Sequence, residues 1–442
     1  MQKINLVPLL LAIVLIALMA PIPAPVSAQG TTWDIYVNDT RDIHDFGINS
    51  VCDADFAAPN DQCTLRAALD EANYWNLGDD AVYIHLPAGH YTLTLSGRNE
   101  NDNETGDLDI TQTNAQIIIE GAGPGLTIID ASALDRVFDL RPNAWVDLRS
   151  LTITGGRTEV PTDPFAYGAG IYNDDAFLTL DSVIIENNSV VCLPGTDNCS
   201  QASGGGLFNR TDDVAVNQTI IRNNSATRGG GIFNTNSDTA PLVLINSTIS
   251  GNHATIAGGG IINYGAMRMI NDTVSGNTAG GTTGGVSNES VLYLANVTIA
   301  RNSADYNAAN LHNVSGATLY LKNSIIADAL GSDYVTNCDG TGTWNTAGYN
   351  ISDDATCHLT AGGDQTNTDP LLTPLAYLGG LTPTHGLLPG SPASNNNPTG
   401  CTDFNGFTIS TDQRGYNRDF VGCDAGAFEG LARVVNLPAI LR

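Results

Sequence analysis

The chain has 442 residues, of which 42% are hydrophobic, and its 46 acidic against 18 basic side chains give a formal net charge of −28. The apolar content excludes a disordered chain. The negative charge excludes nucleic acid and anionic membrane surfaces as partners, because their phosphates would be repelled, and it argues against a polyanionic substrate unless bound cations bridge the repulsion.

Residues 1–28 have the pattern of a secretory signal peptide. Lys3 gives a short basic start, residues 9–20 form an unbroken apolar run, and Val26-Ser27-Ala28 offers small residues for cleavage after Ala28. A retained membrane anchor is the alternative interpretation. No later segment reaches the ~18 apolar residues that a membrane helix needs, so we expect an extracellular or cell-surface protein.

Residues 29–116 differ from the rest of the chain and are predicted to cap it. Thr64–Ala72 is the one convincing helix, because Thr64 is a good N-cap and the apolar residues of this segment share one face. A strand is expected after the turn at Pro87–Gly89.

The densest run of carboxylates in the chain also lies in this cap. It consists of Asp102, Glu104, Asp107 and Asp109. Oxygen ligands at alternating positions suit calcium, although the distal glutamate of an EF-hand is missing. We therefore predict a solvated polar loop and no cofactor, with calcium binding to these four carboxylates as the alternative.

Residues 117–368 repeat two motifs. The first, Gly-Gly-Gly-Ile-x-Asn, places an asparagine at Asn173, Asn209, Asn234, Asn263, Asn288 and Asn313. The second, apolar-x-apolar-x-Asn-x-Thr-Ile-x-x-Asn, places its first polar residue at Asp181, Asn217, Asn246, Asn271, Asn296 and Asn323. Both series keep a common step of 25 residues, with longer steps where insertions occur.

The composition of each repeat selects the fold. Period-two alternation rich in Val, Ile and Thr argues against a helical repeat, and the leucine framework is too sparse for a leucine-rich horseshoe. We predict an all-β fold, a right-handed single-stranded parallel β-helix of roughly ten coils with one short N-terminal capping helix. Apolar side chains should stack inside, and asparagines in one register should bond amide to amide between coils about 4.8 Å apart.

Both ends of the repeats resemble known domains. Cys63-Thr64-Leu65-Arg66-Ala67-Ala68 resembles the signature of CSLREA domains, with Thr64 and Ala67 as departures. Residues 369–430, which close with Cys423-Asp424-Ala425-Gly426-Ala427-Phe428-Glu429, resemble a choice-of-anchor Q domain, and a short tail, 431–442, follows. The coils are similar to pectate-lyase-like β-helices and to polymorphic outer-membrane-protein repeats. These resemblances imply a secreted bacterial β-helix protein.

Eight cysteines fit an oxidising compartment. They form four near pairs, and we predict the local disulfides Cys52–Cys63, Cys192–Cys199, Cys338–Cys357 and Cys401–Cys423. Zinc is the competing interpretation, but no CxxC occurs and no histidine has the spacing of a ligand.

Catalysis, if there is any, should use carboxylates on one face of the coils. Two pairs follow first-series asparagines in neighbouring coils, with arginines close in sequence; the candidates are Asp174, Asp175, Asp212, Asp213, Arg210 and Arg228. Paired carboxylates serve hydrolases, and carboxylate-held calcium with an arginine base serves lyases. The alternative is that these aspartates simply favour turns and solvent.

Two functions remain open after the sequence is read. The first is a secreted or cell-surface protein without catalysis, for surface structure, adhesion or glycan binding, whose partners are extracellular glycans or other surface proteins. The second is a polysaccharide lyase or glycoside hydrolase of the pectate-lyase-like class. Carboxylates clustered with arginine in a groove would favour the enzyme.

Overall fold

The computed structural model describes residues 32–55, 62–74, 81–98, 100–162, 166–196, 199, 201–210, 213–235, 240–332, 335–419 and 422–430. The predicted signal peptide with its cleavage site after Ala28 lies outside the described residues, as do Asp212 and the tail 431–442.

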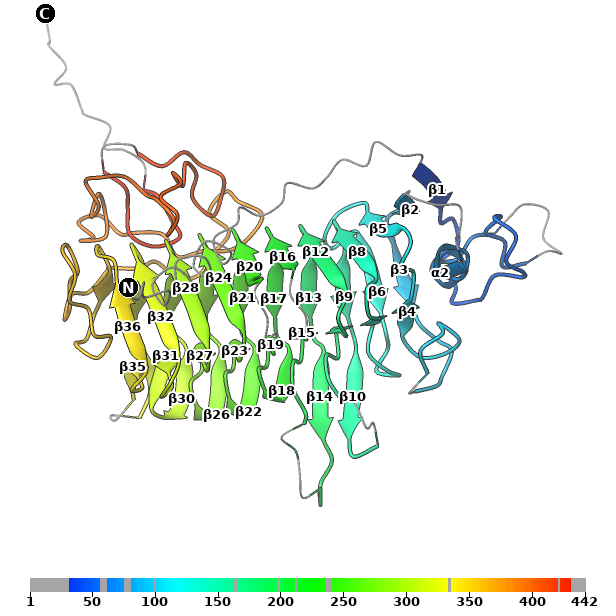
Figure 1. The fold of residues 1–442 in the computed structure, drawn as a ribbon, viewed down its shortest axis with the longest axis horizontal. Coiled ribbons are helices and arrows are strands. Elements are labelled where there is room, and N and C mark those ends of the chain that lie inside the picture. Colours follow the sequence, from blue (N-terminus) through cyan, green and yellow to red (C-terminus); the bar gives the residue numbers. More distant parts are fainter. Residues whose placement is uncertain are drawn as a thin grey trace, which may run out of the picture.

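The chain winds as a solenoid whose strands form four parallel sheets (Figure 1). Sheet A has 11 strands: β1 (Thr32–Tyr36), β2 (Ala81–Leu86), β5 (Gln116–Gly121), β8 (Trp145–Arg149), β12 (Phe177–Asp181), β16 (Val214–Asn217), β20 (Leu242–Ile245), β24 (Ala266–Ile270), β28 (Val291–Ala295), β32 (Thr318–Lys322) and β36 (Thr343–Thr346). Sheet B has 10 strands: β3 (Gly89–Thr92), β6 (Thr127–Asp130), β9 (Thr152–Thr154), β13 (Ile184–Glu186), β17 (Ile220–Arg222), β21 (Thr248–Ser250), β25 (Thr273–Ser275), β29 (Thr298–Ala300), β33 (Ile325–Ala327) and β37 (Ile351–Ser352).

The other two sheets complete the coils. Sheet C has nine strands: β4 (Leu108–Ile110), β7 (Phe138–Leu140), β11 (Ile171–Asn173), β15 (Leu207–Asn209), β19 (Ile232–Asn234), β23 (Ile261–Asn263), β27 (Val286–Asn288), β31 (Ala308–Asn313) and β35 (Thr336–Asp339). Sheet D has seven strands: β10 (Arg157–Val160), β14 (Ser189–Cys192), β18 (Ser225–Arg228), β22 (His253–Ala257), β26 (Thr278–Thr282), β30 (Ser303–Tyr306) and β34 (Leu330–Gly331). The all-β parallel solenoid is thus confirmed, and its right-handed sense and its roughly ten coils stay predictions.

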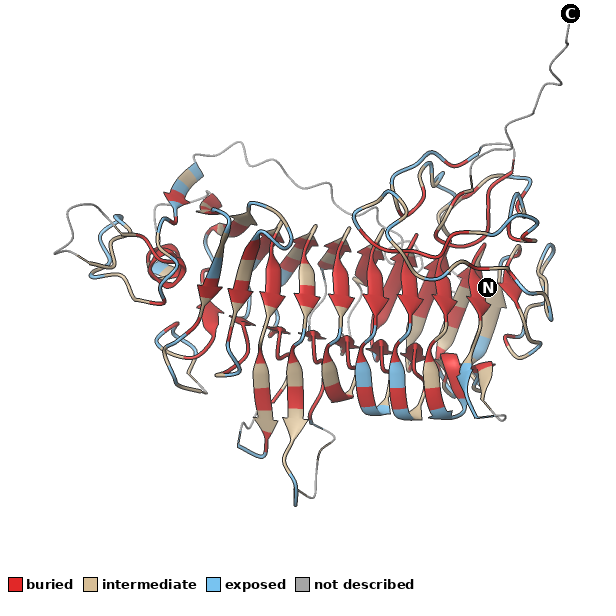
Figure 2. Ribbon diagram, turned by 180° about the vertical axis from the view of Figure 1, so that it is seen from behind, coloured by how far each residue is buried: buried red, intermediate tan, exposed pale blue. Residues whose placement is uncertain are grey.

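The core is a stack of apolar side chains from successive coils. Figure 2 colours in red the buried parts of the strands that supply them. Leu242 and Leu244 point inward from β20 and pair in register with Met267 and Met269 of β24, and all four are fully buried. Burying each such side chain stabilises the fold by roughly 1.5–3 kcal/mol.

The first asparagine series forms the predicted amide ladder. Asn173 Nδ2 donates to Asn209 Oδ1 at 2.9 Å, and the ladder continues coil by coil to Asn313. These side chains are fully buried, so each amide group satisfies the next in place of water.

The second series follows the prediction only in part, since Asn217 Nδ2 donates to Asp181 Oδ1 at 2.7 Å and Asn271 Nδ2 to Asn246 Oδ1 at 3.3 Å. Its members Asn246, Asn271, Asn296 and Asn323 occupy left-handed turns with φ of 50–58°, a conformation that asparagine tolerates better than most residues. A second interior ladder is built from the last asparagine of each motif and runs through Asn188, Asn224, Asn252, Asn277 and Asn302; Asn310 of β31 and Asn337 of β35 continue it.

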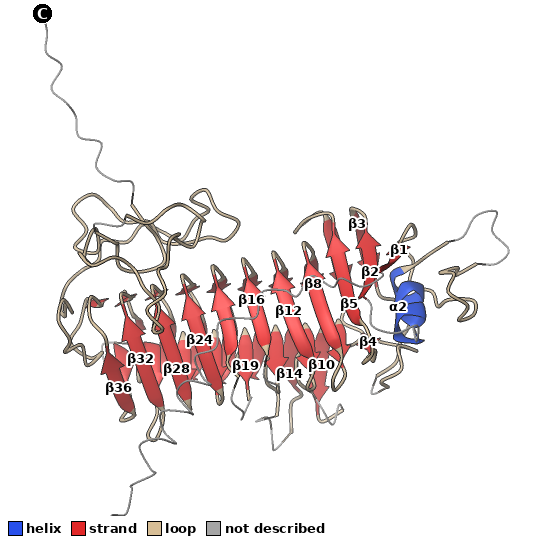
Figure 3. Cartoon of the chain, turned by 45° about the horizontal axis from the view of Figure 1, so that its top comes forward, coloured by secondary structure: helices blue, strands red, loops and turns tan. Residues whose placement is uncertain are grey.

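Helix α2 (Leu65–Tyr74) covers the N-terminal end beside β4 and is the only helix among the described residues (Figure 3). As predicted, Thr64 is its N-cap, because its Oγ1 accepts the N–H of Ala67 at 3.1 Å. Disulfide Cys52–Cys63 lies next to the start of the helix.

Residues 369–419 and 422–430 form loops that lie along the side of the solenoid (Figure 1). They cover the outer face of sheet B, where Leu372, Ala393 and Ala425 pack against Ala300 and Ile325. Gln413 Nε2 reaches Thr248 Oγ1 at 2.8 Å, across 165 residues of sequence.

Candidate functional site

The predicted catalytic aspartates are only partly brought together. Asp174 Oδ1 accepts a hydrogen bond from Arg210 Nη1 at 2.6 Å, so these two of the predicted residues form an ion pair. Asp175 and Asp213 are exposed turn residues with φ of 72° and 59°. Their positions fit the alternative interpretation of turn-forming, solvated aspartates.

Asp174 belongs to a chain of charges on the outer face of sheet C. Arg136 Nη1 lies 2.8 Å from Asp139, whose carboxylate also pairs with Arg141 at 3.3 Å. Arg141 in turn lies 3.9 Å from Asp174. Burial raises the pKa of Asp139, against the opposing effect of Arg136. Arg136 and Asp139 are buried, so only the Arg210 end of this chain is open to a ligand.

Arg228 lies at the other end of a stack of aromatic rings over β11, β15 and β19. The first of these rings, Tyr172, accepts a hydrogen bond from Arg210 Nη1 at 3.1 Å. Phe208 stacks on Phe233 with ring centroids 5.2 Å apart, and Tyr167 stacks on Phe208 at 4.4 Å. Arg228 lies over the rings of Phe233 and Tyr264 and donates to the Tyr264 hydroxyl. No carboxylate partner of Arg228 is found among the described residues.

The candidate calcium loop lies between β3 and β4. Asp107 and Asp109 are fully buried there and are joined by Glu100, which the sequence prediction did not include. Asp102 and Glu104 are exposed. The pKa of Asp109 is raised to about 10, chiefly because the carboxyl is buried and secondly because the charge of Asp107 is close.

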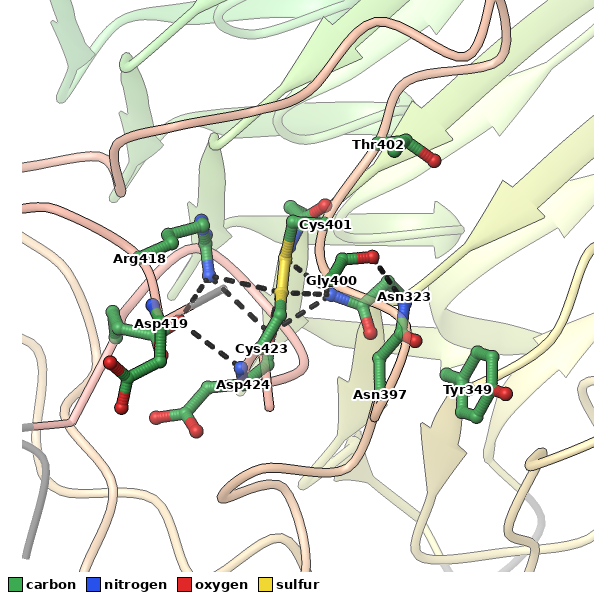
Figure 4. Close-up of a disulfide and its surroundings, with 12 residues drawn as sticks. Asn323, Tyr349, Asn397, Gly400, Cys401, Thr402, Arg418, Asp419, Cys423 and Asp424 are labelled. Atoms are coloured by element: carbon green, nitrogen blue, oxygen red, sulfur yellow. Dashed lines mark hydrogen bonds and ion pairs between the residues drawn. A yellow bond between two sulfur atoms is a disulfide. The ribbon is translucent and has the colours of Figure 1, made fainter. Parts of the chain in front are cut away.

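All four predicted disulfides are present. Cys401–Cys423 joins two C-terminal loops to each other and lies against the solenoid, where Asn323 Nδ2 is 3.1 Å from the sulfur of Cys401 (Figure 4). A cavity of about 100 Å³ beside this disulfide is lined by Arg418, Asp419 and Ile409 among others. It is far below the roughly 300 Å³ at which ligand pockets begin.

A surface that the sequence prediction missed lies on the outer face of sheet A near the N-terminal end. Trp145 of β8 and Phe177 of β12 are directly paired in register, so their rings lie on neighbouring strands. They are 47% and 46% exposed. The alternation of each strand, with Val146 and Leu178 buried, could have placed both rings outward from the sequence.

Polar and aromatic groups surround this pair, and we call the whole set the aromatic face. It comprises the outward side chains of β1, β2, β5, β8 and β12: Asp34, Tyr36, Tyr83, His85, Glu120, Trp145, Asp147, Arg149, Phe177 and Thr179. Tyr36 stacks on His85 at 4.5 Å, and the His85 imidazole contacts Asp34 at 2.8 Å. The Arg149 guanidinium bonds to Asp147, which raises the arginine pKa above its usual value, and also to the Tyr83 hydroxyl.

Fold and cysteines together define the class of this molecule as a disulfide-bonded parallel β-solenoid, which is consistent with an extracellular protein. Within the described residues, no helix has the length and apolar character that crossing a membrane requires.

Two solved structures are similar to the chain. Pectate lyase Pel9A aligns with a TM-score of 0.42 and 16% identity over 89% of this chain and 97% of its own. Geobacillus virus E2 ORF18 aligns with a TM-score of 0.31 and 13% identity over 62% and 53%. No family model matches the chain, and no curated protein matches it.

Proposed function

We propose that the chain is an extracellular glycan-binding solenoid without catalytic activity, and that the aromatic face is its binding surface. The observation that carries the proposal is the pair Trp145 and Phe177, two large aromatic residues in register on neighbouring strands and each nearly half exposed. Large apolar side chains exposed close together on one face are costly in water and typically mark a binding site.

The chemistry of the face suits sugars. The apolar faces of sugar rings can stack on Trp145 and Phe177, as other flat apolar surfaces stack on aromatic rings. Thr179, and farther along the same strands Arg149 and Glu120, are half-buried on this face and offer donors and acceptors for hydroxyl groups. The net charge of −28 favours a neutral glycan over a uronate polymer.

A binding panel tests this proposal. The exported protein would be titrated with neutral glucans, xylans and mannans and with polygalacturonate, and each mixture would be assayed for new reducing ends and unsaturated products. We expect binding of a neutral glycan without cleavage, and a loss of about tenfold or more in affinity in the double variant Trp145→Ala/Phe177→Ala.

Matched controls are available in exposed aromatics far from the aromatic face. Tyr306 is 67% exposed on β30, and Phe407 is 60% exposed in the C-terminal loops. Tyr306→Ala and Phe407→Ala should bind as the parent protein does. Equal affinity of the parent and the double variant would overturn the assignment of the surface.

A polysaccharide lyase or hydrolase is the second candidate. It is favoured by the ion pair of Asp174 with Arg210 and its continuation through Arg141 to Asp139, since carboxylates and an arginine on one face can serve such chemistry. Product formation that disappears in Arg210→Ala would establish this function in place of the first.

We further propose export through the signal peptide, with cleavage after Ala28, followed by a CSLREA-like cap and a choice-of-anchor Q-like segment. The four disulfides support an oxidising destination. Mass spectrometry of the exported protein should find Gln29 at its N-terminus, and a retained residue Met1 would contradict the cleavage.

A further inference from the structure

Three carboxylates converge at the N-terminal edge of sheet C. Asp109 sits on β4 between the inward-facing Leu108 and Ile110, so the strand turns its carboxylate outward. Asp107 precedes the strand, and the β3–β4 loop brings Glu100 back to both. One carboxylate oxygen from each of the three lies within 4.8 Å of the others.

Two of the buried oxygens lack a hydrogen-bond donor. Asp109 Oδ2 accepts the N–H of Asn103 at 3.0 Å, but Asp109 Oδ1 is buried with no donor in the structure. Asp107 Oδ2 likewise accepts no hydrogen bond, although Arg136 Nη1 lies 3.2 Å away. A buried polar atom without a partner costs about 1–3 kcal/mol, and more where it is charged. Asp107 Oδ2 has only its ion pair with Arg136, and Asp109 Oδ1 has no partner, so a cation held between these carboxylates and Glu100 would supply the missing interaction.

The neighbouring arginines do not balance the cluster. Arg136 is shared between Asp107 and Asp139, its closer partner at 2.8 Å. Arg66 donates to the carbonyl oxygens of this loop, but its charge is paired with Asp42 at 2.6 Å. Acidic groups therefore outnumber basic groups around Asp109, and buried acidic groups in this situation either hold a proton or coordinate a metal ion.

We propose that a calcium ion binds to the carboxylates of Glu100, Asp107 and Asp109 and fastens the β3–β4 loop against the end of the solenoid. The ligands are all hard oxygens, and calcium accepts such irregular sets, completing its shell with carbonyl oxygens or water. Magnesium demands a near-ideal octahedron and retains its waters, which suits a buried cluster less well. Glu100 is half-buried whereas the two aspartates are buried, so the ion would enter the site from the Glu100 side.

The same loop explains what the ion would do for the fold. It carries the carbonyl oxygens of Asn103, Gly106 and Asp107 that receive the guanidinium of Arg66, from helix α2. Figure 3 shows α2 and β4 side by side at this end of the solenoid. Calcium would thus join the cap to the first coil of sheet C, and its removal should loosen the cap first.

Calcium titration tests the proposal. The exported protein, stripped with a chelator, would be titrated with calcium chloride by isothermal calorimetry, and its melting temperature recorded with calcium, with magnesium and with chelator. We expect calcium to bind and to raise the melting temperature. Asp109→Asn should lower the affinity by about tenfold or more and abolish the rise.

Control variants lie in the same loop. Asp102→Asn and Glu104→Gln remove exposed carboxylates outside the cluster and should leave calcium affinity unchanged. If Asp109→Asn does not fold, Glu100→Gln gives the same test at a half-buried position.

Three results would overturn the proposal. One is no calcium binding by the parent protein at about 1 mM, the weak end of protein sites, as expected if Asp107 and Asp109 share a proton instead. Another is equal calcium affinity in the parent, Asp109→Asn and Glu100→Gln. A third is equal stabilisation by magnesium, which would reject calcium as the ion.

Discussion

Arg66 and Asp42 form an ion pair whose side chains are both buried, with Arg66 Nε 2.6 Å from Asp42 Oδ1. Asp42 Oδ2 also accepts the N–H groups of Thr94 and Leu95, at 2.6 and 2.9 Å. One pair thereby ties helix α2 to the chain that follows β3.

The first prediction concerns this pair. Asp42→Asn keeps the shape of the side chain but leaves the guanidinium of Arg66 buried without its counter-charge. We expect a destabilisation of about 3–5 kcal/mol, the range for breaking a buried ion pair, measured as a lower urea midpoint. The nearby pair Arg41–Asp39 is exposed, so Arg41→Ala should leave the midpoint where it is. Equal effects of the two variants would contradict the role of Arg66.

The second prediction concerns the first asparagine ladder. Asn263 accepts from Asn234 Nδ2 at 2.8 Å and donates to Asn288 Oδ1 at 2.9 Å. Asn263→Leu removes both bonds inside the core and should cost about 1–3 kcal/mol for each buried group left without a partner. Thermal unfolding would show the loss.

The control for the ladder is an asparagine outside it. Asn187 is exposed in a left-handed turn with φ of 57°. Asn187→Gly fits that backbone and should change the melting temperature little. If Asn263→Leu were as stable as the parent, the ladder would contribute specificity of register and no net stability.

The first ladder could be predicted because register alone determines it. Once the repeat is parallel and steps by 25 residues, Asn263 and Asn288 must stack, whatever the details of the turns. The second ladder could not be assigned in this way, because each motif holds two asparagines in constant register. Only the left-handed backbone at Asn271 turns that side chain away and leaves Asn277 to face inward.

The residues of the candidate calcium site are brought together by contacts that do not follow the 25-residue repeat. Glu100 joins Asp107 and Asp109 only because an irregular loop returns to the sheet edge, and irregular loops leave no pattern in a sequence. The packing of the C-terminal loops on sheet B is equally non-local. By contrast, the exposed Trp145 and Phe177 follow from strand alternation and could have been recognised.

The third prediction tests the close approach of coils at the triple-glycine motif. A Cβ atom on Gly230 would lie 2.4 Å from the carbonyl oxygen of His253 and 2.6 Å from that of Gly259. Both obstacles are backbone atoms of the next coil and cannot rotate away. Gly230→Ala should therefore cost about 1–3 kcal/mol or more and reduce the yield of folded protein, as measured by thermal unfolding.

Gly362→Ala is the matched control for this substitution. A Cβ atom there meets nothing within 4 Å, so the variant should be as stable as the parent or slightly more so, by about 0.4–1 kcal/mol. A Gly230→Ala protein with the parent melting temperature would show that the coils can move apart at the motif without cost.

The fourth prediction concerns pH and His385, which is buried between sheet B and the C-terminal loops. Its Nδ1 lies 2.7 Å from the carbonyl oxygen of Thr373, which can only accept, so Nδ1 carries the proton and Nε2 accepts from the Ser275 hydroxyl at 2.8 Å. Burial lowers the pKa of His385 below 6.5; the Thr373 carbonyl opposes this, and the positive charge of Arg301 adds to it.

The sign of the pH effect follows from that shift. Below pH 6.5 the imidazole of His385 takes up a proton in the unfolded chain but stays neutral in the folded protein. The contribution of His385 to the free energy of unfolding is therefore complete above about pH 6.5 and is lost as the pH falls toward the pKa in the folded protein. The slope cannot exceed about 1.4 kcal/mol per pH unit for one proton. His385→Gln removes the titration, whereas His253→Gln replaces an exposed histidine on β22. We expect the free energy of unfolding to fall less steeply between pH 7 and pH 5 in His385→Gln than in the parent or in His253→Gln. If the free energy of unfolding fell equally in all three proteins, His385 would not make the packing of the C-terminal loops depend on pH.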